Sequence, residues 1–181
     1  MKRTMNKNRI RRLVYASLFA ALTCVLTMLI QLPTPTKGYM NLGDAMVLLS
    51  GWMLGPLYGG LAAAVGSMLA DIFSGYFLYA PATFLIKGAM ALLGYGVSRL
   101  LQAKSKKYMV LSYAVSGIVA ETVMIFGYFF FEATVAGYGF AGAWIGVPNN
   151  LMQAILGVVL GTLLMTVMDE MHLAERIHIK K

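Results

Sequence analysis

Residues 13–32 read LVYASLFAALTCVLTMLIQL, a run of twenty positions without a charged side chain. A helix of that length rises about 30 Å, which matches the hydrocarbon core of a bilayer. Pro33 and Pro35 come next and end the helix, because proline disfavours helical geometry in the residue before it. The run is too long for the apolar part of a secretory signal, and no small-x-small cleavage site precedes Pro33. We therefore predict a retained transmembrane helix.

The composition of the whole chain is that of a membrane protein. Of 181 residues, 59% are apolar and only 12% are charged, and the mean hydropathy is +0.72. The formal net charge of +8 would suggest nucleic acid in a soluble protein. Here the basic residues cluster between the apolar runs and at the two ends, which is the pattern of membrane topology. We predict a single all-α membrane domain.

Working outward from residues 13–32, the apolar runs predict six transmembrane helices. A break at Gly55-Pro56 separates the second from the third, and Asp44 stands where a helix cap is expected. The Gly-rich stretch 133–142 is predicted to be a loop. The helices are expected at residues 13–32, 45–54, 57–73, 82–101, 109–131 and 144–168, between a basic segment, 1–12, and a polar tail, 169–181.

The second predicted helix is short, because ten residues rise only about 15 Å. Merging residues 42–73 into one pass would give five helices and put the basic loop 102–107 on the opposite side from residues 1–12. Six passes place 13 of the 15 basic residues on one side, all except Lys37 and Lys87, and the positive-inside rule favours that arrangement. Both termini are then cytoplasmic, and the loop before helix two is expected to dip into the bundle.

Polar residues at membrane depth lie mostly in the outer halves of the predicted helices, where ionisable groups normally face a cavity or a partner. Aromatic and amide residues in the outer loops lie beside them. Together they predict an outward-opening pocket with aromatic walls. The candidate binding residues are Tyr39, Asn41, Asp44, Asp71, Tyr76, Tyr79, Lys87, Asn149, Asn150 and Gln153, with Glu121 deeper in the bundle.

Structural roles are open alternatives for several of these residues. Asp44 is equally expected as a helix cap, and Asp71 as a residue at the headgroup level. Tyrosines at helix ends are commonly interfacial anchors, and Lys87 is able to extend its amine outward by snorkelling. Adjacent Asn149 and Asn150 need hydrogen-bond partners in an otherwise apolar helix, which favours a binding role.

Several functional classes are excluded by missing motifs. The sequence has no phosphate-binding P-loop, so an ATPase activity of its own is not expected. Both histidines, His172 and His178, lie in the polar tail, and we predict no metal site, no cofactor and no enzyme activity. Small residues recur at four-residue spacing, as at Gly51, Gly55 and Gly59, which favours close helix packing.

Four segments together resemble the substrate-binding S components of energy-coupling-factor (ECF) vitamin transporters, and are most similar to the branch for hydroxymethylpyrimidine or pyridoxine. The resemblance covers nearly the whole chain in order, and its specific part is residues 38–88. The segments are Gly38-Tyr-Met-Asn-Leu-Gly-Asp44, Gly55-Pro-Leu-Tyr-Gly59, Gly66-Ser-Met-Leu-Ala-Asp71 and Tyr79-Ala-Pro-Ala-Thr-Phe-Leu-Ile-Lys-Gly88.

The resemblance implies a six-helix bundle that binds a vitamin or precursor under the loop between helices one and two. It also implies a transmembrane T component and two cytoplasmic ATPase subunits as partners, with Ala16 and Ala20 matching an Ala-x-x-x-Ala motif that contacts the T component. Pyridoxine and hydroxymethylpyrimidine are the expected ligands, and riboflavin or another vitamin is the alternative. A stand-alone transporter lacks a polar path through the inner leaflet, and a membrane scaffold leaves the one-sided polar cluster unexplained.

Overall fold

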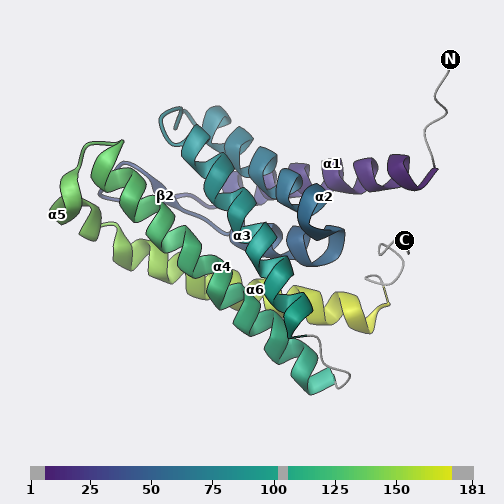
Figure 1. The fold of residues 1–181 in the computed structure, drawn as a ribbon. Coiled ribbons are helices and arrows are strands. Elements are labelled where there is room, and N and C mark those ends of the chain that lie inside the picture. The colour runs from purple at the N-terminus through teal and green to yellow at the C-terminus, as the bar shows by residue number, and fades with distance from the viewer. Residues whose placement is uncertain (1–6, 102–105, 173–181) are drawn as a thin grey trace, which may run out of the picture.

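The computed structural model describes residues 7–101 and 106–172, and nearly all of them are helical (Figure 1). The prediction of a mostly helical chain is confirmed. A two-stranded antiparallel hairpin, β1–β2, lies between the first two helices and was not predicted. The elements are α1 (Lys7–Leu29), β1 (Leu32–Pro33), β2 (Tyr39–Met40), α2 (Asp44–Phe73), α3 (Ala80–Leu100), α4 (Lys106–Thr134), α5 (Gly139–Trp144) and α6 (Val147–Glu170).

Five of these helices, α1, α2, α3, α4 and α6, are long and apolar enough to cross a membrane. Large apolar side chains are exposed along them, for example Leu29, Leu85 and Leu100. In water such a surface would be unfavourable, whereas in a bilayer it faces hydrocarbon. This chain is a multi-pass membrane protein.

The chain reverses direction inside α2, at Gly55. The backbone there has φ 79° and ψ −176°, a conformation open essentially only to glycine. Ser50 Oγ donates a hydrogen bond of 3.1 Å to the carbonyl of Gly59, although nine residues of straight helix would rise about 13 Å. The predicted break at Gly55-Pro56 is confirmed. The structure joins the two predicted helices directly, so that they form one bent element rather than two separate ones (Figure 1).

Glycines allow the helices around this bend to touch backbone to backbone. A Cβ atom on Gly51 would lie 2.5 Å from the carbonyl oxygen of Ala91 in α3, and one on Gly66 would lie 2.4 Å from that of Ala20 in α1. Both distances are far below van der Waals contact. The prediction that the recurring small residues serve internal packing is confirmed at these positions.

The first half of α2 runs through the centre of the bundle, and α2 packs against α1, α3 and α6. Leu48 is fully buried there, together with Met90 of α3 and Met124 of α4. Trp52 also packs inside, and its indole nitrogen donates to Ser116 Oγ at 3.1 Å. The second half of α2 and α3 form the antiparallel pair that leads to the site.

Several helix boundaries differ from the predicted ones; for example, α6 begins at Val147 rather than at residue 144. α1 begins at Lys7, within the predicted basic segment, because Lys and Arg are good helix formers. α4 continues through Glu132 to Thr134. Within the predicted loop 133–142 the chain starts a short helix, α5, which is held by Phe140 and Trp144 packing on Phe129 of α4. Most of the predicted tail, residues 173–181, lies outside the described residues.

Candidate binding site

The loop between α1 and α2 folds back over the ends of α3 and α4. The β1–β2 hairpin reverses the chain, and Thr36 at its tip is buried. Thr36 Oγ1 donates to Glu132 Oε1 at 2.8 Å, and the Tyr79 hydroxyl donates to the Thr36 carbonyl at 2.5 Å. Protein groups thus satisfy part of the loop's polar backbone, as a loop that dips into the bundle would require.

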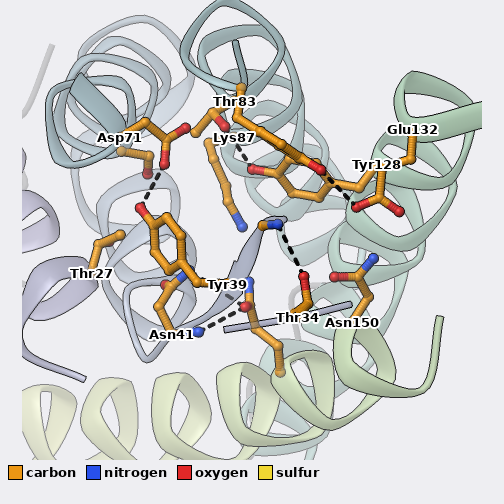
Figure 2. Close-up of a pocket in the computed structure, with 14 residues that line it drawn as sticks. Thr27, Thr34, Tyr39, Asn41, Asp71, Thr83, Lys87, Tyr128, Glu132 and Asn150 are labelled. Atoms are coloured by element: carbon orange, nitrogen blue, oxygen red, sulfur yellow. Dashed lines mark hydrogen bonds between the residues drawn. The ribbon is translucent and has the colours of Figure 1, made fainter. Parts of the chain in front are cut away.

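A cavity lies beneath this loop and between the helices (Figure 2). Its empty space is about 450 Å³, a figure that includes space open to solvent. Three tyrosines supply its aromatic walls. The lining residues are Thr27, Thr34, Gly38, Tyr39, Asn41, Ser67, Asp71, Tyr79, Thr83, Lys87, Tyr128, Glu132, Asn150 and Gln153.

A buried polar network joins three helices and the loop residue Asn41 at one side of the cavity. Lys87 of α3 forms an ion pair with Asp44 of α2, and their exposed fractions are 2% and 1%. Gln153 of α6 donates to Asp44 Oδ2 at 2.6 Å and accepts from the backbone nitrogen of Asn41 at 2.9 Å. Buried charges are tolerated only when paired and hydrogen-bonded in this way. We call Asn41, Asp44, Lys87 and Gln153 the polar network.

Two structural alternatives for these residues are wrong. Asp44 is the first residue of α2, but the cap position is Gly43, and no side chain caps the helix by a hydrogen bond. The Asp44 carboxylate is turned to Lys87 because an uncompensated lysine inside the bundle would be far more costly than an uncapped helix end. Lys87 does not snorkel to the surface; its amine stays buried, 5.4 Å from the centre of the Tyr128 ring.

Glu121 lies next to the polar network but does not line the cavity. It is 2% exposed, and neither of its carboxyl oxygens accepts a hydrogen bond from a described residue. A Cβ atom on Gly157 of α6 would fall 2.3 Å from Glu121 Oε1 and 3.0 Å from Asp44 Cβ. Glu121 and Asp44 therefore both lie against the α6 backbone at this glycine. Among residues 7–101 and 106–172, no group of three or more His, Cys, Asp or Glu is placed to hold a metal ion.

Asp71, near the end of α2, lies on the opposite side of the cavity from Glu132 in Figure 2. It is 4% exposed and accepts a 2.5 Å hydrogen bond from the Tyr39 hydroxyl. Burial, followed by the negative charge of Asp71, raises the pKa of Tyr39 above its usual value. Tyr39 therefore stays a donor. Tyr76, a further predicted site residue, packs against its ring with centroids 4.6 Å apart.

Glu132, in the last turn of α4, is the second carboxylate of the cavity and is 3% exposed. Tyr79 donates to it at 3.3 Å in addition to its bond with Thr36. Burial, and then the charge of Glu132, raises the pKa of Tyr79, so this hydroxyl is also held protonated. One oxygen of each carboxylate, Asp71 Oδ2 and Glu132 Oε2, has no hydrogen-bond partner among the described residues.

Most of the predicted site residues are brought together by the fold. Those that line the cavity are Tyr39, Asn41, Asp71, Tyr79, Lys87, Asn150 and Gln153. Asp44, Tyr76 and Glu121 stand directly behind this lining. Asn149 does not line the cavity, although its neighbour Asn150 does.

Sequence reasoning missed seven lining residues: Thr27, Thr34, Gly38, Ser67, Thr83, Tyr128 and Glu132. Small hydroxyl residues and a tyrosine within apolar runs carry little signal, because they are common in membrane helices. Glu132 had a usable signal. An acid at the end of a transmembrane helix is as exceptional as Asp71, but residue 132 fell just past the predicted helix 109–131.

The two alanines predicted to contact a T component are half-buried and pack against the chain's own core. The carbonyl of Ala20 lies in close contact with Gly66 of α2. Internal packing therefore uses at least part of the small-residue face of α1. Contact of Ala16 and Ala20 with a partner stays a prediction.

Two solved structures share this fold. One, described as the S component of a bacterial ECF transporter, has a TM-score of 0.66 and 21% identity, covering 94% of this chain and 99% of that one. The other, the S component for biotin from an ECF-type ABC transporter, has a TM-score of 0.53 and 18% identity, covering 89% of this chain and 94% of that one.

Two sequence relatives extend over most of the chain. An uncharacterized Pyrococcus woesei protein is 36% identical over 138 residues, covering 76% of this chain and 87% of that protein. The thiamine precursor transporter HmpT of Lactococcus lactis is 28% identical over 168 residues, covering 91% and 90%. The family model described as "ECF-type riboflavin transporter, S component" matches residues 7–170. The family predicted from the residues is confirmed, and this chain belongs to the S components of ECF-type transporters.

Proposed function

We propose that this S component binds a small planar heteroaromatic vitamin or precursor in the cavity beneath the β1–β2 loop, with hydroxymethylpyrimidine or pyridoxine as the favoured ligands. The observation that carries the proposal is the cavity itself, in which Tyr39, Tyr79 and Tyr128 surround a few polar anchors. Tyrosine faces stack on aromatic rings, and single polar groups at the ring edge give orientation and specificity. The similarity to HmpT supports the same class of ligand.

Riboflavin is the second candidate, favoured by the description of the family model. Its tricyclic ring and ribityl chain need far more room than a single ring does. The loop tip is tied down by Thr36 and Tyr79, and this arrangement favours the smaller ligands. A stand-alone transporter or a scaffold is disfavoured by membership of the S-component family.

The proposed ligand class is tested by binding to the purified chain. We expect a small heteroaromatic molecule to copurify and to be identified by mass spectrometry. Titration in detergent should then show saturable binding of hydroxymethylpyrimidine or pyridoxine. Either compound should bind more tightly than riboflavin does. Uptake into cells should require coexpressed T and ATPase subunits, because the energy comes from other chains. Saturable binding of riboflavin alone would show that the second candidate is correct.

The proposed topology is six membrane passes with both termini in the cytoplasm, which treats the two halves of α2 as separate passes. Its support is the reversal at Gly55, because Asp71 lies beside the cavity and Asp44 beside Lys87, whereas a straight helix would hold these two acids about 40 Å apart. The same arrangement collects the basic loop 102–107 with residues 1–12 on one side.

Cysteine labelling distinguishes six passes from five. In a Cys24→Ser background, Pro35→Cys and Ala141→Cys, both at exposed positions, should react with an impermeant thiol reagent applied to intact cells. Ser105→Cys, which lies outside the described residues, should react only after permeabilisation. With five passes, positions 105 and 141 would exchange their behaviour while position 35 stayed accessible, so the pattern of all three decides the count.

A further inference from the structure

We propose that the cavity selects a cationic or amino-bearing ring and rejects anions, with Glu132 and Asp71 receiving the ligand's hydrogen-bond donors. This inference rests on the proposed function and narrows its ligand class. The aminopyrimidine class, with an amino group beside a basic ring nitrogen, has the matching chemistry.

The first step is an inventory of which hydrogen-bonding groups are already used. All three tyrosine hydroxyls of the cavity are bonded to protein groups: Tyr39 to Asp71, Tyr79 to Thr36 and Glu132, and Tyr128 to Thr83 at 2.9 Å. These tyrosines therefore present their ring faces to a ligand, and their hydroxyl groups are already bonded to the protein. A ligand between them is recognised by stacking, and its polar edges must find other partners.

The second step concerns the carboxylates. Asp71 and Glu132 are 4% and 3% exposed and line the cavity from two sides, and each keeps one oxygen without a hydrogen-bond partner among the described residues. A buried carboxylate needs donors or a cation, because leaving an acceptor unsatisfied is costly. Ligand N–H groups would satisfy this need, whereas ligand acceptors would not.

The third step is the charge balance. Lys87 is the one basic residue that lines the cavity within the described parts of the chain, and Asp44 already neutralises it. Its remaining N–H groups still suit a neutral ring acceptor. A phosphate or carboxylate in the cavity would face two acids and no unpaired cation, and like charges at close range repel each other. An anionic ligand is therefore disfavoured.

The test compares three probes on the purified full-length chain by equilibrium titration. They are 4-amino-5-hydroxymethyl-2-methylpyrimidine, its analogue with a methyl group in place of the amino group, and its phosphate ester. We expect the amino compound to bind about tenfold more tightly than the methyl analogue, which lacks the donor, and about a hundredfold more tightly than the ester.

Glu132→Gln should weaken binding of the amino compound by about tenfold to a hundredfold, and binding of the methyl analogue by less, because the amide loses the charge that attracts the donor. Asp71→Asn provides a second, independent variant with the same expectation. Glu170→Gln is the matched control, since this exposed acid ends α6 about 30 Å along the helix from Asn150.

The outcomes separate the inference from the proposed function. If single-ring compounds bind but the ester binds as well as the amino compound, the charge argument is wrong and the proposed function stands. Unchanged selectivity in both acid variants would likewise overturn the inference. If no ring compound binds at all, both fail. The comparison of the three probes on the unmodified chain tests the proposed selectivity even if a variant does not fold.

Discussion

Lys87→Met is expected to lower the stability of the detergent-solubilised protein by about 3–5 kcal/mol, because it leaves the Asp44 carboxylate buried without its cation. The pair is almost completely enclosed, with exposed fractions of 2% and 1%. Gln153 alone would remain as a hydrogen-bond donor to Asp44 among the described residues. Vitamin affinity should fall as well, since Lys87 lines the cavity.

The double variant Asp44→Asn/Lys87→Met distinguishes a lost ion pair from a simple packing defect. Its asparagine can still accept from Gln153, and no charge is left unpaired, so most of the lost stability should return. Lys37→Met serves as the control, because this lysine is exposed in the loop. The measurement compares the melting temperatures, in one detergent, of the unmodified protein, Lys87→Met, the double variant and Lys37→Met. Equal melting temperatures for Lys87→Met and Lys37→Met would show that the pair adds nothing to stability.

The sequence predicts the membrane helices well because their signal is local. The apolar runs behind α1, α3, α4 and α6 need only their own composition to be recognised. The reversal at Gly55 is equally readable, since Gly followed by Pro interrupts a helix whatever surrounds it. The unpredicted helix α5 depends instead on contacts of Phe140 and Trp144 with Phe129 of α4, which no local pattern contains.

The site is predictable in its position but not in its pairings. Polar residues at similar depth on different helices indicate a shared cavity, and Lys87, Gln153 and Asp71 do line one cavity in the structure. The partner of Lys87 depends on how α2 and α3 are rotated about their axes, which depth alone leaves undetermined. The sequence therefore leaves a capping role for Asp44 as an alternative. Glu132 lies at a helix end, and its contact with Thr36 of the hairpin loop is not visible in the sequence.

Gly59→Ala is expected to destabilise the protein strongly although it adds only one methyl group. The new Cβ would lie 2.2 Å from the carbonyl oxygen of Ser50 and 2.9 Å from the Cα of Gly51. Both are backbone atoms, so no side-chain rotation relieves the clash, and the two halves of α2 must separate. Overpacking of this kind costs about 1–3 kcal/mol and occasionally more. The hydrogen bond from Ser50 to Gly59 would be strained at the same time.

Gly96→Ala is the matched control for this substitution. It lies within α3, and a Cβ there meets nothing within 4 Å, so the change should be neutral or slightly stabilising through helix propensity. Thermal unfolding and ligand titration of both variants give complementary results. Because the bend brings the two ends of α2 to the site, with Asp71 lining the cavity and Asp44 bonded to Lys87, forcing its halves apart should lower vitamin affinity together with stability. If Gly59→Ala melted and bound ligand like Gly96→Ala, the close contact between the two halves of α2 would be refuted, and with it the main structural support for six membrane passes.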